Sequence, residues 1–200
     1  MRRLIESTFV TLGGEIGSPH VWGPQYLNTE QQDYVNKLLF AADALLLGRV
    51  TYEGFSRSYP DMDRDSSDGP DAFIERMNSI PKFVASRTLK TMSWNATLLE
   101  GDVAKAVAEL KRRSGMSILK FGTGPLDVTL MEHGLIDEFH FWIFPVALGT
   151  GQRLFEDSPV TTHLKLVEST TLSTGVVVLK YVPIPASANR PGSSPRRTQT

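Results

Sequence analysis

Three short stretches of the chain combine glycine, hydroxyl and arginine residues in a way that suits an anionic ligand. They are "GRVTY" from Gly48 to Tyr52, "SRT" from Ser86 to Thr88, and "GTGPL" from Gly122 to Leu126. A guanidinium group can bind a phosphate through two hydrogen bonds, and "GTGPL" would open a helix whose free N–H groups attract anions. Each stretch follows a short apolar run typical of a buried parallel strand. We therefore predict a phosphate-bearing ligand at the carboxyl ends of these strands.

Each stretch taken alone also has an ordinary structural explanation. Gly48 could serve backbone freedom only, Arg49 and Arg87 could be solvated surface charges, and "GTG" could be a tight loop. The chain has neither the complete G-x-G-x-x-G fingerprint nor the G-x-x-x-x-G-K-[ST] sequence. A standard Rossmann domain and a P-loop are therefore not predicted. The occurrence of all three stretches at successive strand ends favours ligand binding.

The composition excludes several other kinds of site. The chain has 200 residues, no cysteine and a formal net charge of −1. Without cysteine there is no disulfide, zinc-thiolate site or thiol catalysis, and the scattered histidines lack ligand spacing, so no metal is predicted. A charge near zero gives no general attraction to nucleic acid or anionic membranes. With no signal-peptide core and no apolar run of spanning length, we expect a cytoplasmic protein without nucleic-acid or membrane partners.

Strand patterns bounded by turn residues recur along the chain. We predict strands at Leu4–Leu12, Ala44–Gly48, Lys82–Ser86, Ile118–Gly122, Glu138–Leu148, Leu164–Ser169 and Val176–Val182. The early strands alternate with helical patterns, whereas the last three follow one another directly. This order indicates a single α/β domain whose C-terminal part is antiparallel.

Helical patterns fill the connections between the early strands. In "NTEQQDYVNKLLFAAD", Thr29 and Gln32 are expected to form a capping box ahead of an apolar stripe. The other helices are predicted to begin near Thr51, after the N-cap Asp102 and at Pro125.

Two polar segments fall outside these patterns. Residues 56–71, "SRSYPDMDRDSSDGPD", are predicted to contain a mobile loop beside the site. Residues 183–200 have too little apolar content to order themselves and are predicted to form a disordered tail. The folded domain is therefore expected to span residues 1–182.

Four stretches, in this order, resemble a known family: "LLLGRVTYEGF", "IPKFVASRTL", "ILKFGTGPLDVTLMEHGLIDEF" and "PVALGTGQRLF". They are similar to the dihydrofolate-reductase-like superfamily, and more narrowly to the reductase half of bacterial bifunctional riboflavin-biosynthesis deaminase-reductases. The resemblance covers about Arg2 to Val182. It implies a mixed central sheet flanked by helices and an NADPH-dependent reductase that transfers hydride to a C=N or C=O bond of a small heteroaromatic or sugar-linked substrate. By motif match, the cofactor would be bound by Gly48, Arg49, Thr51, Ser86, Arg87, Thr88, Gly122, Thr123, Gly124 and Leu126.

The chain departs from the family where acids are expected. The family commonly reads "SLDG" where this chain reads "TLGG", so Gly13 replaces an aspartate that would face the substrate. Gln32 lies near the place of the acid on the first helix of dihydrofolate reductase, and an amide cannot supply a proton. Dihydrofolate reductase activity itself is therefore not expected. Glu15 and Glu53 remain possible acids, although supporting a loop and a helix are their simpler roles.

Aromatic residues near the predicted turns could enclose a flat substrate, although such residues more often belong to a core. We expect the substrate pocket to include Phe9, Gly13, Trp22, Gln32, Tyr52 and Pro145. The apolar run "EFHFWIFPVALG" is predicted to form core or a subunit interface, and we expect a homodimer built through the C-terminal strands. His140 on this run is interpreted as a structural hydrogen-bonding residue.

A second function stays open beside the reductase. A non-catalytic module or sensor that binds NADPH or another nucleotide would keep the cofactor-binding turns while losing acids that face a substrate. Gly13 and Gln32 are residues that such a protein would show.

Overall fold

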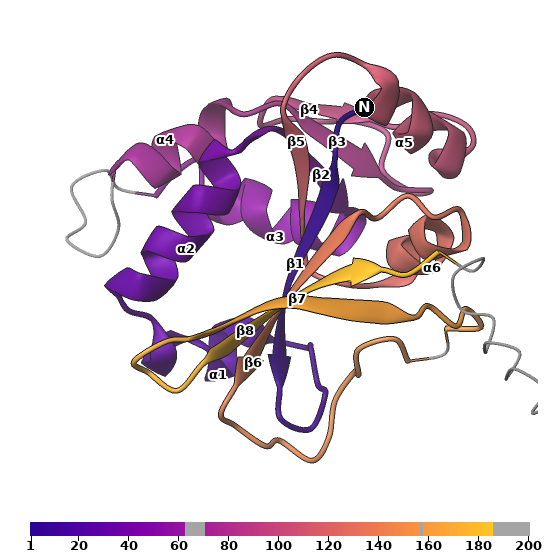
Figure 1. The fold of residues 1–200 in the computed structure, drawn as a ribbon. Coiled ribbons are helices and arrows are strands. Elements are labelled where there is room, and N and C mark those ends of the chain that lie inside the picture. The colour runs from indigo at the N-terminus through magenta and orange to yellow at the C-terminus, as the bar shows by residue number, and fades with distance from the viewer. Residues whose placement is uncertain (63–70, 157, 186–200) are drawn as a thin grey trace, which may run out of the picture.

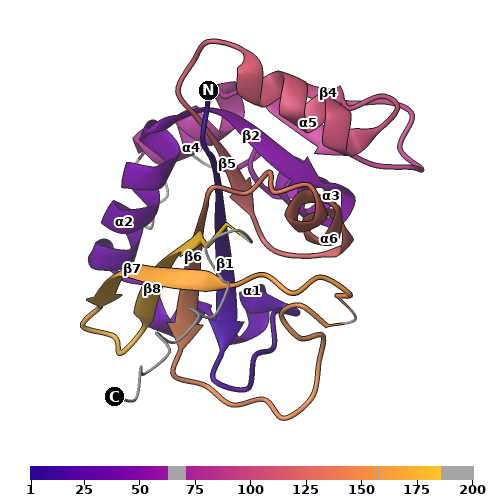
Figure 2. The ribbon, with the colours of Figure 1, turned by 45° about the vertical axis from the view of Figure 1, so that its right-hand side comes forward.

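The fold is built on one mixed sheet, seen in a computed structural model that describes residues 1–62, 71–156 and 158–185 (Figures 1 and 2). The eight strands of this sheet lie in the order β4-β3-β2-β5-β1-β6-β8-β7. Their bounds are β1 Leu4–Thr11, β2 Ala42–Gly48, β3 Lys82–Ala85, β4 Ala96–Leu98, β5 Ser117–Phe121, β6 Glu138–Phe144, β7 Leu164–Thr171 and β8 Val177–Pro183. Neighbouring strands from β4 to β6 are parallel, whereas β8 is antiparallel to both β6 and β7. The predicted dihydrofolate-reductase-like sheet with antiparallel C-terminal strands is confirmed.

Helices cover both faces of this sheet (Figures 1 and 2). They are α1 Pro19–Trp22, the 3-10 helix η1 Pro24–Tyr26, α2 Thr29–Phe40, α3 Arg49–Ser58, α4 Asp71–Ser79, α5 Val103–Arg112 and α6 Pro125–Glu132. Residues of α5 and α6 pack on one face, and residues of α2, α3 and α4 pack on the other. Within the described residues, no helix is long and apolar enough to cross a membrane.

Alternation along the central strands explains their continuous apolar sequences. Leu46 and Ile118 face the α5 and α6 side, while their neighbours Leu45 and Leu119 face the α2, α3 and α4 side. All four side chains are fully buried. A strand with helices on both faces needs apolar residues at every position, as "ALLLG" shows.

A third cluster of apolar residues fills the C-terminal half of the sheet. Trp142 and Phe144 of β6 pack there with Trp22 of α1 and with Val176 and Val178. β6 lies between β1 and β8, and its apolar side chains pack in the core of the chain itself. The strand ends at Phe144 rather than at the predicted Leu148.

The start of α2 differs from the prediction by one residue. Asn28 is the N-cap, and its side-chain oxygen accepts the Gln31 N–H at 2.9 Å, so the predicted capping box of Thr29 and Gln32 is wrong. Gln31 is consequently the buried amide of this helix, while Gln32 donates to Asn36 at 3.1 Å. The N-cap Asp102 is confirmed by its hydrogen bond from the Lys105 N–H at 3.0 Å.

Other boundaries also shift. α3 begins at Arg49, directly after β2, rather than near Thr51. Of the predicted loop, residues 56–58 belong to α3, Asp71 begins α4, and residues 63–70 lie outside the described residues. The strand β8 extends one residue past the predicted domain boundary, and most of the predicted tail, residues 186–200, also lies outside the described part.

Candidate active site

The three stretches that suit an anionic ligand meet at one edge of the sheet. "GRVTY" follows β2, "SRT" follows β3 and "GTGPL" follows β5. Gly48 pairs in register with Ala85, and β5 lies on the other side of β2, with Leu46 paired to Lys120. Because the three strands are parallel neighbours, their carboxyl ends are side by side. The topological arrangement thus brings the predicted cofactor residues into one region.

Two of these stretches are in close proximity. Gly122 has a φ of +72°, and a methyl group on its Cα would lie 3.5 Å from the Thr51 hydroxyl oxygen. The left-handed conformation favours glycine at this position. The first turn of α3 therefore approaches the turn that opens α6.

At two other glycines, neither the backbone conformation nor the packing explains the absence of a side chain. Gly48 has a φ of −75° and Gly124 a φ of −178°, both accessible to any residue. A Cβ at either position would meet no atom within 4 Å. Glycine at these two positions therefore leaves open space beside the backbone, which a ligand could approach closely. These positions fit a nucleotide cofactor that lies against the backbone.

The two arginines of the site differ in what they contact. Arg49 is paired with Glu53 of the same helix, with Nη1–O distances of 3.0 and 3.2 Å. Arg87 is exposed and makes no ion pair within residues 1–62, 71–156 and 158–185. The Ser86 hydroxyl accepts the N–H groups of Thr88 and Leu89 at 3.2 and 3.0 Å, which closes the turn around Arg87. Arg87 is thus the better placed cation for a phosphate.

A buried acid lies beneath the turn that opens α6. The Thr123 hydroxyl donates to Glu6 Oε1 at 2.5 Å and lies 2.8 Å from the Thr8 hydroxyl. Glu6 is fully buried, and its Oε2 has no partner. Burial, and next the nearby Asp127, raise the pKa of Glu6 well above its ordinary value. Thr123 therefore anchors the turn to β1, and its hydroxyl is directed inward.

A buried ion pair fixes the other side of the same turn. Lys120 Nζ lies 2.7 Å from Asp127 Oδ1, and both side chains are almost completely inaccessible. Lys120 also donates to the Gly122 carbonyl, and Asp127 accepts the Gly124 N–H at 2.7 Å. With the Gly124 N–H engaged and no N–H on Pro125, the first amide that α6 offers to a ligand is that of Leu126. Sequence analysis missed this network, although a lysine inside "SILKF" was its signal.

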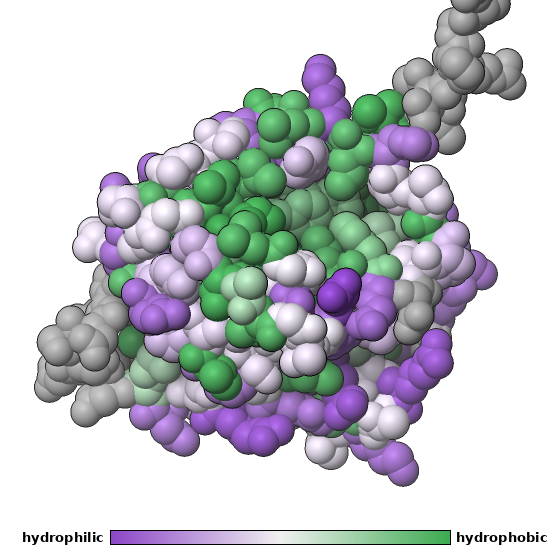
Figure 3. All heavy atoms as spheres, turned by 90° about the horizontal axis from the view of Figure 1, so that it is seen from below, coloured by the Kyte–Doolittle hydropathy of each residue, from purple (hydrophilic) through white to green (hydrophobic). Residues whose placement is uncertain are grey.

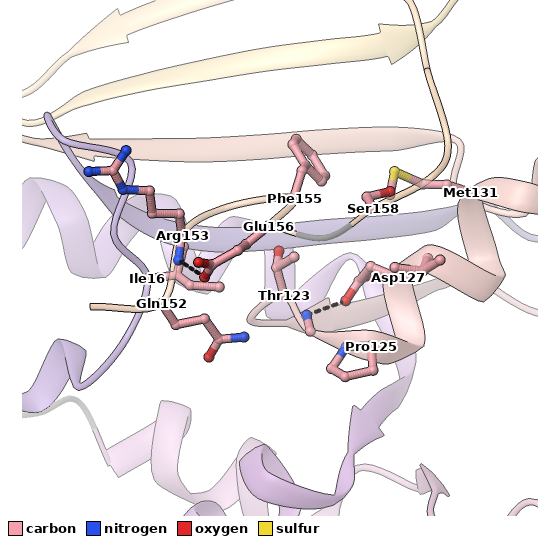
Figure 4. A pocket seen from close by; sticks show the side chains of 12 residues that line it. Ile16, Thr123, Pro125, Asp127, Met131, Gln152, Arg153, Phe155, Glu156 and Ser158 are labelled. Atoms are coloured by element: carbon pink, nitrogen blue, oxygen red, sulfur yellow. Dashed lines mark hydrogen bonds between the residues drawn. The ribbon is translucent and has the colours of Figure 1, made fainter. Parts of the chain in front are cut away.

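A cavity of about 260 Å³ opens beside this turn. Thr123 and Asp127 line it from the α6 side, while Gln152, Arg153 and Phe155 line it from the connection that follows β6 (Figure 4). The Arg153 N–H donates to Glu156 at 2.9 Å and shapes this connection. The connection belongs to "PVALGTGQRLF", in which Pro145 was predicted as a site residue but Gln152, Arg153 and Phe155 were not.

Comparison with known proteins assigns the family. Residues 2–178 match the model of the RibD C-terminal domain. The chain belongs to the RibD C-terminal domain family. This membership implies an oxidoreductase.

Individual relatives agree with the RibD family assignment. An uncharacterized Bacillus subtilis protein, YyaP, is 30% identical over 183 residues, which cover 90% of this chain and 94% of that protein. A structure of a putative riboflavin biosynthesis protein from Shewanella matches with a TM-score of 0.70 and 21% identity over 91% of this chain and 99% of its own. The chain also matches 57% of a Thermotoga maritima diaminohydroxyphosphoribosylaminopyrimidine deaminase/5-amino-6-(5-phosphoribosylamino)uracil reductase, using 92% of its own length, with a TM-score of 0.61 and 16% identity.

Some of the residues of this chain that were predicted to bind substrate gather at the ends of β1 and β6. Phe9 and Trp22 lie with ring centroids 4.8 and 5.1 Å from that of Phe144. The Pro145 carbonyl accepts a hydrogen bond from Tyr26 at 3.2 Å. Phe9 and Trp22 belong to the third apolar cluster, so they support this end of the fold as core residues.

Tyr52 and Gln32 do not join this group. Tyr52 belongs to α3, and its side chain is buried. Its hydroxyl lies 3.3 Å from the Ser93 carbonyl oxygen and accepts the Ser93 N–H at 2.9 Å. The ring of Tyr52 fills the core between α3 and the sheet, and its substrate contact stays a prediction. Gln32 is engaged with Asn36, because the helix begins one residue earlier than predicted.

The molecular surface at this end of the sheet is apolar. Viewed from below Figure 1, where β1 and β6 finish, hydrophobic side chains occupy the centre of the face (Figure 3). Leu12, Val21, Leu27 and Leu148 are exposed large hydrophobic residues in the connections at this end. An exposed apolar area of this kind is typical of a surface that binds a ligand or a partner.

Proposed function

We propose that the chain is an NADPH-dependent reductase that transfers hydride to a C=N or C=O bond of a small heteroaromatic or sugar-linked substrate. The observation that carries this proposal is the meeting of "GRVTY", "SRT" and "GTGPL" at the ends of β2, β3 and β5. Membership of the RibD C-terminal domain family supports the same reaction class.

The chain's own residues divide the binding of NADPH between them. Gly48 and Gly124 leave room for the cofactor against the backbone, and the Leu126 N–H at the start of α6 suits its diphosphate. Arg87, with the hydroxyls of its turn, suits the 2′-phosphate. NADPH supplies the hydride when bound, so the protein need only bind both reactants, orient them and exclude water.

The substrate class follows from the family and from the shape of the site. We propose a compound like 5-amino-6-(5-phosphoribosylamino)uracil, the compound named for the Thermotoga relative. It joins a flat pyrimidine to a phosphorylated sugar. The apolar face around Leu12 and Leu148 would cover the ring, and the polar side chains of Gln152 and Arg153 in the cavity at the start of α6 would bind the sugar part.

Oxidation of NADPH tests this function directly. The purified chain would be mixed with NADPH and, in turn, a pterin, a deazaflavin and ribosylaminopyrimidines that include the phosphorylated sugar compounds of the riboflavin pathway. Substrate-dependent loss of NADPH absorbance is expected with a ribosylaminopyrimidine. Tight NADPH binding without turnover of any compound would favour the non-catalytic module instead, and absence of NADPH binding would overturn both.

A further inference from the structure

Glu15 is a buried carboxylate with one oxygen left without a partner. It follows β1, and only 1% of its surface is exposed. Its N–H donates to the Thr11 hydroxyl at 3.0 Å, and that hydroxyl in turn donates to Oε2. This hydrogen bond from Thr11 holds the pKa of Glu15 below its ordinary value, so the group is an anion at neutral pH. Among the residues that the structure describes, Oε1 has no hydrogen-bond partner, and the nearest cation, Arg153, is 4.0 Å away.

The Glu15 carboxylate occupies the place of a side chain on residue 13. A Cβ built on Gly13 would lie 2.5 Å from Glu15 Oε1 and 2.8 Å from Cδ, and closer still to Oε2. An aspartate at position 13 would hold its own carboxylate oxygens at a similar distance from this Cβ. Gly13 has no positive φ, so the space that Glu15 occupies, rather than backbone conformation, opposes a side chain there, and Glu15 would have to move to admit one. The Glu15 carboxylate thus lies where the carboxylate of an aspartate at position 13 would lie.

Glu15 also lies beside the residues of the site. The next residue, Ile16, and the partner across the β-bridge, Arg153, both line the cavity at the start of α6. The strand that precedes it, β1, neighbours β5 and its cofactor turn. A buried anionic oxygen without a donor is costly, and a ligand that brings an N–H or O–H group would remove that cost.

We propose that Glu15 is the substrate-binding carboxylate of this chain and that its Oε1 accepts a hydrogen bond from an amino or hydroxyl group of the substrate. This inference rests on the proposed reductase function. The aminopyrimidine and ribosyl parts of the proposed substrate class both carry such donors. Position 13 is glycine because the carboxylate comes from position 15.

A pair of variants separates substrate binding from loop support. Glu15→Gln removes the charge at nearly the same shape, whereas Thr11→Val removes the hydroxyl that supports the loop and keeps the carboxylate. Both would be assayed with NADPH and the compound that the wild-type chain reduces fastest. We expect Glu15→Gln to lower kcat/KM for that compound by about ten- to a hundred-fold, with KM for NADPH unchanged. Thr11→Val should cause a much smaller loss, and equal losses in the two variants would overturn the proposal.

A second pair tests the shared place of the two carboxylates by thermal stability and by recovery of activity. Gly13→Asp in the wild-type chain should lower the thermal midpoint, because two like charges would compete for one space. In a Glu15→Ala background the same change should lower it less and should restore part of the lost kcat/KM. An equal fall in both backgrounds, or no recovery of activity, would overturn the proposal. If the wild type reduces no compound, the reductase function fails and this inference fails with it; activity that Glu15→Gln leaves intact refutes the inference alone.

Discussion

At the scale of single residues, the charge of a side chain and the partners that it already has decide whether it is available to bind a ligand. Arg49 directly follows β2 and Arg87 lies two residues after β3, and the sequence alone already favours Arg87 for a phosphate because hydroxyl residues flank it. The structure pairs Arg49 with Glu53 and leaves Arg87 exposed within a turn of hydroxyl groups. Because α3 begins at Arg49, both Arg49 and Glu53 belong to this helix. Residues four apart in a helix lie on the same face, so the two side chains can pair.

Arg87 is expected to determine cofactor preference. The 2′-phosphate is the difference between NADPH and NADH, and a charge-assisted contact to it contributes roughly 1.5–3 kcal/mol. Arg87→Ala should therefore weaken NADPH binding by about ten- to a hundred-fold and leave NADH binding nearly unchanged. Titrations that follow cofactor fluorescence measure both. Arg112→Ala, an exposed arginine at the end of α5, serves as the control. Equal losses for the two cofactors would assign Arg87 to the fold or to the diphosphate.

Glu6 is expected to make the free energy of unfolding depend on pH. Its pKa in the folded chain lies above its ordinary value of 4.5, because of burial and the neighbouring Asp127. The stability contributed by the protonated acid is complete below pH 4.5 and is lost as the pH rises through the raised pKa. Glu6→Gln keeps the neutral shape, so its stability relative to the wild type should increase with pH.

Urea unfolding at a series of pH values from mildly acidic to mildly alkaline tests the Glu6 prediction. Glu53→Gln is the control, since Glu53 is partly exposed and paired with Arg49. A constant difference between Glu6→Gln and the wild type at every pH would mean that Glu6 is charged in the folded chain. In that case the turn at Thr123 would be held by an anion rather than by a neutral acid.

At the scale of elements, strand patterns were the most informative part of the sequence. All seven predicted strands exist, since runs such as "ALLLG" and "FHFWIF" are buried on both faces and can be read without tertiary information. The short strand β4, with partly exposed residues, and the helix α4 carry weak patterns and were missed. The side-chain network of Glu6, Lys120 and Asp127 was also missed, because their proximity depends on the pairing of β1 with β5.

The N-cap of α2 gives a test of how an element boundary is set. Asn28 and Thr29 are both good caps in sequence, and only the structure shows that Asn28 bonds the Gln31 N–H. Asn28→Ala should lower the free energy of unfolding by about 1 kcal/mol, and Thr29→Ala should have a much smaller effect. Chemical denaturation of both variants measures this difference. The reverse order of effects would restore Thr29 as the cap and shift Gln32 back toward the buried face.

At the scale of the whole molecule, the arrangement of the sheet limits where a second copy could bind. Phe139, Trp142 and Phe144 of β6 are fully buried within the chain itself, so this run forms core, one of the two roles that the sequence suggested. The edge strand of the C-terminal half of the sheet is β7, where Leu166 and Val167 are 47% and 53% exposed. An edge strand also presents unpaired N–H and C=O groups to a partner.

We therefore propose a homodimer that forms through β7, the outermost of the C-terminal strands. Each chain is 22.2 kDa, and the wild type should sediment at twice that mass at micromolar concentration. Val167→Asp places a charge in the expected interface and should shift the chain to a monomer without loss of helical circular dichroism, because the residue makes no part of the apolar clusters. Met116→Asp introduces the same charge at a residue that is 49% exposed directly before β5, and it should leave the mass unchanged. A monomeric wild type would refute the homodimer, and a dimer that survives Val167→Asp would place the interface elsewhere, with the exposed apolar face at the ends of β1 and β6 as the next surface to test.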